Sequence, residues 1–440
     1  MKTSYFIKSA VVSALCLLSF QMKAQTVVDG IAYKVVDGVA ETSQLPGDVK
    51  YTLATINIPA NVTIDGTSYP VKIGDNSMRE NNNLTSLTIA DGVEVIGNSA
   101  FAQCENLPAV VLPSSIKTID VWAFYGCKKL ASINIPDGVE IITEHTFQET
   151  ALTEVVLPAS VTTLDVCSFQ TTPLTSINLE NVTIIRGWAL AQTKITSVSA
   201  PKVTNVGGTA FYECFDLVTA DLPNVTVVEG GIFKNCNNLV SVNMPKSTNT
   251  GAECFNGCSS LESVTMNSLK NIGDWAFANC TSLTKLTIPN TVVLVGAWAL
   301  EKTGLEEVYI SWDEDGLSEL YLGDNFYGTE DGASDFVWKV PEELFDLYGD
   351  EWEGLPVEVG VSGIGNNQVA NANAYYANGS LNLINLDGYS ANVISLDGRV
   401  VSSIQVVGDN SEVAVDLASG IYLLSATKGS DKVAAKFIVK

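Results

Sequence analysis

Apolar and polar residues follow one pattern that repeats about every 22 residues along much of the chain. In each repeat an apolar residue is followed three and five positions later by two more, as in Leu283, Leu286 and Ile288. Alternation of this kind is typical of a short β-strand with one buried face. A second extended piece follows, as in "VEVIG" and "LKNIG", and then an apolar pair such as "AF". The pattern predicts two short strands and one inward-pointing aromatic residue per turn.

The position of the inward residue fixes the period. Successive members lie 21 to 23 residues apart: Met78, Phe101, Phe124, Phe147, Phe169, Leu190, Phe211, Phe233, Phe255, Phe277 and Leu300. So constant a spacing over eleven turns is typical of a solenoid, in which each turn packs on its neighbours. We therefore expect a mainly β solenoid of about eleven turns, with the Phe residues in its core. Glycines in "IGNSAF" and "VGGTAF" are expected at turns that need positive φ.

The stretches "LASINIPDGVEIITEHTF" and "LESVTMNSLKNIGDWAFANC" resemble the repeat of the BspA-like leucine-rich-repeat surface proteins of Bacteroidetes, roughly L-x-x-I-x-I-P-x-x-V-x-x-I-G-x-x-A-F-x-x-C. The resemblance covers residues 25–360. It implies an amino-terminal cap with the first turn at 25–83, repeats at 84–310 and a carboxy-terminal cap at 311–360. End caps are needed because an open solenoid end exposes apolar surface and unpaired strand edges.

Cysteine follows the inward residue by three positions in six turns, which we call the cysteine ladder: Cys104, Cys127, Cys214, Cys236, Cys258 and Cys280. Threonine takes this place at Thr150, Thr172, Thr193 and Thr303. The exchange favours small, buried, weakly hydrogen-bonding side chains. Disulfides between neighbouring turns stay open as an alternative, because eight cysteines remain outside the first 24 residues and adjacent turns lie within bonding range.

Both ends of the chain carry features of export. Residues 1–24 read as a signal peptide, because Lys2 and Lys8 precede the apolar run "AVVSALCLLSF". A polar linker is expected at 361–380 and a small β-sandwich at 381–440. "NVISLDGRVV", "VDLASGIYLLSA" and "KFIVK" resemble the carboxy-terminal sorting domain of type IX secretion substrates, matching its motif at Gly398, Arg399, Gly420, Ile421, Tyr422 and Lys440. An ordinary β-sandwich module is the alternative.

Composition and motif content argue against several classes of function. The formal net charge of −25 and only three arginines argue against nucleic acid as a partner. No stretch beyond the signal is long and apolar enough for a transmembrane helix. Zinc would need clustered thiolates or histidine, whereas the ladder cysteines recur once per turn, so we expect no metal or cofactor. His145 is the sole histidine, and no nucleophile elbow, Walker loop or dinucleotide fingerprint occurs, so no catalytic residue is predicted.

The strongest enzymatic rival is a carbohydrate-active enzyme on a β-helix, which groups acids on neighbouring strands. Outward strand positions hold acids only at Glu154, Asp221 and Glu307, three or more turns apart. At about 4.8 Å per turn they are too far apart for paired acid/base catalysis. A purely structural envelope protein is a further alternative.

Two features could bind a partner. The outward strand positions form a row of Ser, Thr and Asn that includes Asn178 and Asn243 and ends at Tyr309. The position two residues before the inward residue holds Trp122, Trp188, Trp275 and Trp298. An aromatic row can stack on sugar rings, although partial burial beside the Phe layer is the commoner explanation for such a row. The sequence favours an exported or outer-membrane surface protein that binds an extracellular protein, another cell or a glycan.

Overall fold

The computed structural model describes residues 25–47, 49–328, 335–360, 373–377, 380–384, 386–395, 400–408, 410–415, 417, 420–428 and 431–439. The predicted signal peptide lies outside this part. The described residues divide into two compact units. The first holds residues up to 284 with 291–305 and 319–328; the second holds 285–290, 306–318 and the described residues from 335 onward.

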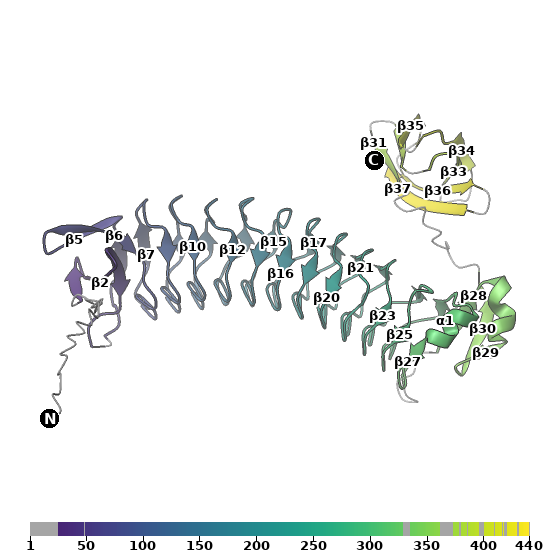
Figure 1. Cartoon of the computed structure of the whole chain (residues 1–440), viewed down its shortest axis with the longest axis horizontal. Helices are drawn as coiled ribbons and strands as arrows, with labels where there is room; N and C mark the ends of the chain where they lie inside the picture. Colours follow the sequence, from purple (N-terminus) through teal and green to yellow (C-terminus); the bar gives the residue numbers. More distant parts are fainter. Residues whose placement is uncertain are drawn as a thin grey trace, which may run out of the picture. The chain divides into compact units, whose positions relative to one another are not determined.

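The first unit is largely a stack of short turns, most of which contribute one strand to each of two faces (Figure 1). The first face consists of β4 (Thr55–Ile58), β7 (Ser86–Ile89), β9 (Ala109–Val110), β11 (Ser132–Ile133), β13 (Glu154–Val155), β15 (Ser176–Ile177), β17 (Ser197–Ser199), β19 (Thr219–Asp221), β21 (Ser241–Asn243) and β22 (Ser263–Thr265). The second face consists of β8 (Val95–Ile96), β10 (Thr118–Ile119), β12 (Ile141–Ile142), β14 (Thr163–Leu164), β16 (Ile184–Ile185), β18 (Asn205–Val206), β20 (Val227–Val228), β23 (Asn271–Ile272), β25 (Leu294–Val295) and β27 (Tyr321–Leu322).

Pairing between turns is parallel and in register with the repeat. In β19 and β21, Ala220 lies beside Val242 and Asp221 beside Asn243. Equivalent residues of successive turns are therefore neighbours in space, so one residue type at one repeat position forms a continuous row. The solenoid has about 12 turns, one more than the eleven that we aligned, because β27 belongs to a further turn.

The inward Phe residues form two stacked columns in the first unit. Consecutive rings from Phe101 to Phe169 have centroids 5.4 to 5.9 Å apart, and those from Phe211 to Phe277 lie 5.2 to 5.8 Å apart. All are fully or almost fully buried. Leu190 separates the two columns, since its turn carries no ring at this position.

Glycines before the inward pair have a different role from the one that we expected. Gly97, Gly207 and Gly273 do not adopt positive φ. A Cβ on Gly273 would lie 2.4 Å from the carbonyl oxygen of Gly251 in the preceding turn. These glycines are needed because the backbones of neighbouring turns approach closely, and the expected positive φ was wrong. The left-handed residue follows two positions later, as at Ser99 after Gly97.

Five strands form a sheet at the amino-terminal end of the first unit. They are β1 (Thr26–Val28), β2 (Ile31–Val36), β3 (Val39–Ser43), β5 (Asn61–Ile64) and β6 (Thr67–Lys72), in the sheet order β1-β2-β3-β6-β5. Neighbours pair antiparallel except β3 and β6, which pair in parallel. Asp-Gly pairs make three of the hairpin turns, with both residues at positive φ, as the tight type I′ turn requires. β4 pairs in parallel with β7, so the stack begins directly beside these strands.

The second unit contains a five-stranded sheet of order β24-β26-β28-β30-β29. Its elements are β24 (Lys285–Thr287), β26 (Glu307–Tyr309), β28 (Val337–Val340), β29 (Glu351–Trp352) and β30 (Leu355–Val359), with α1 (Glu314–Glu319), η1 (Glu342–Leu344) and α2 (Phe345–Tyr348) between them. Trp312 and Trp338 are buried against Trp352, and the Tyr348 hydroxyl donates a hydrogen bond to the Trp312 carbonyl at 2.7 Å. Aromatic packing thus encloses the last turns.

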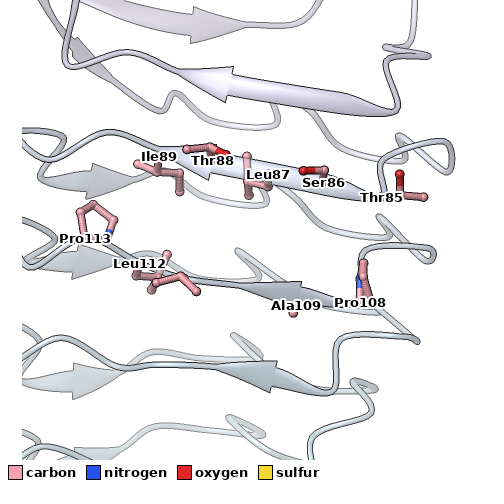
Figure 2. A pocket seen from close by; sticks show the side chains of 10 residues that line it. Thr85, Ser86, Leu87, Thr88, Ile89, Pro108, Ala109, Leu112 and Pro113 are labelled. Atoms are coloured by element: carbon pink, nitrogen blue, oxygen red, sulfur yellow. The ribbon is translucent and has the colours of Figure 1, made fainter.

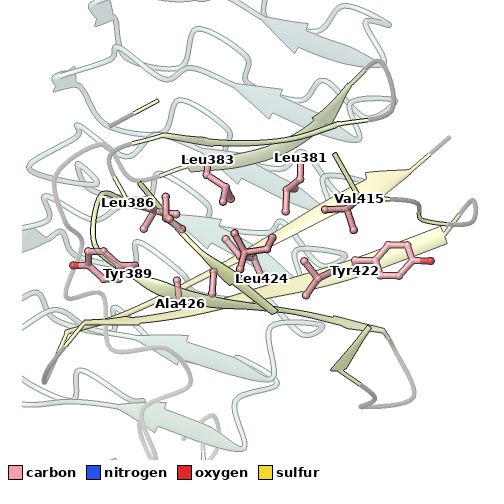
Figure 3. Packing of buried hydrophobic residues seen from close by; sticks show 12 residues of the cluster. Leu381, Leu383, Leu386, Tyr389, Val415, Tyr422, Leu424 and Ala426 are labelled. Atoms are coloured by element: carbon pink, nitrogen blue, oxygen red, sulfur yellow. The ribbon is translucent and has the colours of Figure 1, made fainter. Parts of the chain in front are cut away.

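The carboxy-terminal strands form two antiparallel sheets, β31-β32-β35 and β34-β33-β36-β37. Their bounds are β31 (Asn373–Ala377), β32 (Ser380–Ile384), β33 (Ser390–Ser395), β34 (Val400–Gln405), β35 (Asn410–Ala414), β36 (Gly420–Lys428) and β37 (Asp431–Val439). Buried residues of both sheets, among them Leu381, Leu383 and Leu424, form the core between them (Figure 3). β31 lies within the range 361–380 that we expected to be linker.

Three residues of the sorting motif fall in this sandwich. Gly420 begins β36, Ile421 pairs with Ile438 of β37, and Tyr422 is buried in the core. Gly398, Arg399 and Lys440 lie outside the described residues.

Candidate binding site

Two backbone positions per turn adopt left-handed geometry, one two residues before the inward residue and one two residues after it, as at Glu80 and Gln103. We call the first of these, before the inward residue, the left-handed position. All eleven members have φ between 52° and 68°: Asn76, Ser99, Trp122, His145, Cys167, Trp188, Thr209, Gly231, Glu253, Trp275 and Trp298. For bulky residues this region is unfavourable, at roughly 1–3 kcal/mol each. Every tryptophan of the predicted binding row therefore occupies a backbone geometry that favours glycine, as found at Gly231.

The tryptophans at the left-handed position gather in three ring clusters along the first unit. Trp122 lies face to face with His145 at 3.9 Å between centroids and edge-on to Tyr125 at 4.7 Å. Trp188 packs at 5.1 Å on Tyr212 of the next turn. Trp275 and Trp298 stack almost parallel at 5.0 Å. Trp188 and Trp275 stay 36% and 37% exposed, so part of their ring surface faces solvent.

Side chains behind Trp122 hold its ring in place. His145 covers one face, its Nδ1 is hydrogen-bonded to Gln148, and its Nε2 lies 3.1 Å from Glu144 Oε1. Tyr125 supports the edge and donates its hydroxyl to Glu149 at 3.2 Å. The sole histidine thus positions an aromatic side chain.

A pocket of about 390 Å³ opens beside Trp122. Its lining residues come from three successive turns: Asn76 and Arg79 from the first, Asn98, Ser99 and Ala102 from the second, Trp122 and Tyr125 from the third. The small residues of the middle turn leave space between the larger side chains on either side. Our sequence analysis identified Trp122 but missed the rest of this pocket. The sequence feature that could have identified it is the position directly after the inward residue, which holds Arg79, Ala102 and Tyr125 in three successive turns.

The predicted polar row on the first face is largely engaged with the protein itself. Asn178 accepts a hydrogen bond from the Leu157 N–H at 2.7 Å and donates to the Leu157 carbonyl at 2.9 Å, so its amide joins two turns. Asn243 donates to Asp221 at 2.7 Å. In the second unit, the Tyr309 hydroxyl donates to Glu307 at 2.9 Å, and Glu307 also pairs with Lys285. These three candidates stabilise the sheet surface.

A second hollow, of about 510 Å³, lies on the first face between β7 and β9 (Figure 2). Ser86 and Thr88 border it on β7, Pro108 directly precedes β9, and Pro113 follows that strand by three residues. The nearby Val111 side chain is 79% exposed. This hollow is open, and its side chains carry no charge.

The cysteine ladder lies inside the first unit, and all eight cysteines of the described residues are buried and free. Each ladder thiol donates to the carbonyl of the inward residue in the preceding turn, for example Cys236 to Phe211 at 3.0 Å and Cys280 to Phe255 at 3.2 Å. Threonine at the same place donates within its own turn, as Thr150 does to Phe147 at 2.8 Å. Our sequence analysis treated cysteine and threonine as equivalent at this position, whereas they donate to different carbonyl groups.

Burial governs the protonation of most of these thiols. It raises the pKa of Cys104 to about 12 and the pKa of Cys127 and Cys258 well above the ordinary value. At Cys214 burial acts in the same direction, but hydrogen bonds with Cys236 and Thr193 outweigh it and lower the pKa. A buried thiol with a raised pKa stays protonated and unreactive near neutral pH. Within the described ranges, no group of three or more His, Cys, Asp or Glu residues could hold a metal ion. None of the helices described here has the length and apolarity that crossing a membrane requires.

Comparison with known protein families gives two matches. The BspA type leucine rich repeat region matches residues 71–196 and 204–318 in six copies. A secretion system C-terminal sorting domain matches residues 377–440. A tail of this type IX class indicates export to the cell surface or outer membrane. The search of curated proteins found no match to the chain.

Several solved structures are similar. A leucine-rich repeat protein from Bacteroides ovatus is 21% identical, with a TM-score of 0.53, over 76% of this chain and 99% of its own. A leucine rich cell surface protein from Faecalibacterium prausnitzii is 26% identical, with a TM-score of 0.45, over 69% of this chain and 94% of its own. The first of these likenesses supports the leucine-rich-repeat fold.

Proposed function

Because the chain belongs to the BspA-type leucine-rich repeat family and ends in a secretion sorting domain, we propose that it works outside the cell as a non-enzymatic binding protein that adheres to an extracellular protein, another cell or a glycan. An amino-terminal signal peptide at 1–24 would start its export.

One observation carries the proposal, namely the aromatic residues at the left-handed position. Trp122, Trp188, Trp275 and Trp298 occupy a geometry that disfavours bulky side chains, although Gly231 and Asn76 fill the same position elsewhere. Unfavourable backbone geometry persists where function or tight packing requires it. Partly exposed tryptophans are also the residues that contribute most to binding at interfaces. A row of such rings on one edge suits adhesion.

Catalysis finds less support in the arrangement of acids. Glu154 and Asp221 stand on β13 and β19, with two first-face strands of the intervening turns between them. Asp221 accepts a hydrogen bond from Asn243. Paired acid/base chemistry needs two carboxyl groups about 5–9.5 Å apart, on either side of one substrate bond, and three turns at about 4.8 Å each exceed that span.

Purified protein should be applied to immobilised matrix proteins, whole bacterial cells and a glycan array. We expect binding to at least one of them, weakened more than tenfold in a Trp188→Gly, Trp275→Gly, Trp298→Gly variant. Phe215→Ala is the matched control, because Phe215 is a half-exposed aromatic residue outside the left-handed position. Absence of binding to every target, or equal loss in the control, would reject the proposal.

A further inference from the structure

The pocket beside Trp122 has the shape and chemistry of a site for one ring. Its end walls come from alternate turns, which lie about 9.6 Å apart at the usual strand spacing. Ser99 and Ala102 on the turn between them are too small to fill that space. A ring between the walls needs about 3.5–4.0 Å to the carbon atoms of each wall, so the space holds a single ring.

We infer, on the basis of the proposed binding function, that this pocket binds a neutral pyranose unit of a glycan. The free face of the Trp122 indole borders the pocket, since His145 covers its other face. An aromatic face carries partial negative charge and attracts the C–H groups of a sugar ring. Amide groups of Asn76 and Asn98, and the Ser99 hydroxyl that donates to Asn98 at 2.7 Å, also line the pocket, where they can bond sugar hydroxyls.

Charge around the pocket favours a neutral sugar over an acidic one. Arg79, the one cationic lining residue, pairs with Glu80 at 3.3 Å, and Glu80 also bonds Lys50. Glu149 stands behind Tyr125, and the whole chain has a net charge of −25. A uronate or sialate would meet a repulsive field without an unpaired cation to offset it. The tryptophan also distinguishes this pocket from the hollow between β7 and β9, which lacks an aromatic wall.

Native affinity electrophoresis tests this inference with the full chain in gels that contain mannan, galactan, β-glucan or, as the acidic comparison, polygalacturonate. Retardation is expected in at least one neutral gel. Trp122→Gly should weaken that retardation about tenfold or more, which is the usual effect of losing one stacked ring. Glycine suits the backbone there, since φ is 63°. Phe215→Ala removes a half-exposed aromatic residue that lies outside the pocket and outside the left-handed position, and it should bind as wild type does.

A second variant keeps Trp122 and fills the pocket. Ser99 occupies the left-handed position, which accepts tryptophan in four other turns, so Ser99→Trp should fold and still lose retardation. Unchanged or stronger binding by Ser99→Trp, equal losses in Trp122→Gly and Phe215→Ala, or retardation by polygalacturonate alone would overturn the inference. If these results appear while the protein still binds matrix proteins or cells, the glycan site is wrong and the adhesion function stands.

Discussion

The thiol of Cys258 donates a hydrogen bond to the carbonyl of Phe233, one turn earlier, at 3.1 Å. Thr172 occupies the equivalent place in its turn, yet its hydroxyl donates to Phe169 of the same turn at 2.8 Å. Covalent bonds and hydrogen bonds of sulfur are longer than those of oxygen, so a thiol reaches the carbonyl of the preceding turn. Cysteine at this position therefore joins neighbouring turns, whereas threonine closes its own turn.

Replacing Cys258 by threonine should remove one bond between turns. The new hydroxyl is expected to donate to Phe255 of its own turn, so the free energy of unfolding should fall by about 1 kcal/mol. Urea denaturation followed by tryptophan fluorescence measures the change. Thr172→Cys is the reverse control, because a thiol there could reach Phe147. A loss in the control without a loss in Cys258→Thr would contradict this account.

Stability should fall at alkaline pH because of the buried thiols. Burial raises the pKa of Cys104 from 9.0 to about 12. Below pH 9 the thiol keeps its proton in both states, whereas between pH 9 and 12 only the unfolded chain releases it. Each such thiol costs about 1.4 kcal/mol per pH unit in that window. In reductant, the free energy of unfolding should decline when it is measured at pH 8, 9 and 10. In Cys104→Thr the slope against pH should be smaller by the contribution of one thiol. Identical slopes in the two proteins would rule out this role for Cys104.

Removing the amide of Asn178 should destabilise the sheet and leave adhesion intact. Asn178→Ala leaves the Leu157 N–H and carbonyl without their side-chain partner, at a cost of about 1–3 kcal/mol. Asn243→Ala is the matched control, since within the described residues its amide bonds the exposed Asp221 carboxylate alone, and it should cost less than about 0.5 kcal/mol. Thermal unfolding and the binding array report both properties. Weakened binding by folded Asn178→Ala would return Asn178 to the binding site.

The repeat architecture could be read from the sequence because its determinants are local. Each turn repeats the same apolar spacing around a residue such as Phe233 or Phe255, and period and burial follow directly from that spacing. The family and the sorting domain were recognisable for the same reason. Eleven imperfect copies average out the ambiguity that any single short strand carries.

The left-handed position and the pocket could not be read in the same way. Tryptophan rarely adopts positive φ, so Trp122 and Trp275 did not indicate this geometry in the sequence. Gly231 is the member of the row whose residue type is typical of it. The pocket depends on Ser99 and Ala102 being small between larger neighbours. That relationship joins residues 23 positions apart, and it becomes visible only once the turns are stacked.

Ser168 offers a substitution that should raise stability. It directly precedes the inward Phe169, where alanine stands in several other turns, including Ala189 and Ala210. Its side chain is fully buried, and within the described residues its hydroxyl has no hydrogen-bond partner. An unsatisfied buried hydroxyl costs about 1–3 kcal/mol, and alanine removes that cost while leaving the smallest possible gap.

Ser168→Ala should therefore raise the free energy of unfolding by about 1 kcal/mol, measured by urea denaturation. Thr146→Ala is the matched control, because Thr146 holds the same position and its hydroxyl donates to the Thr143 carbonyl at 2.9 Å. The control should lose stability, since it gives up a satisfied bond and a buried methyl group. A loss of stability in Ser168→Ala would mean that its hydroxyl is paired in solution, with a water bound inside the solenoid as the partner to look for.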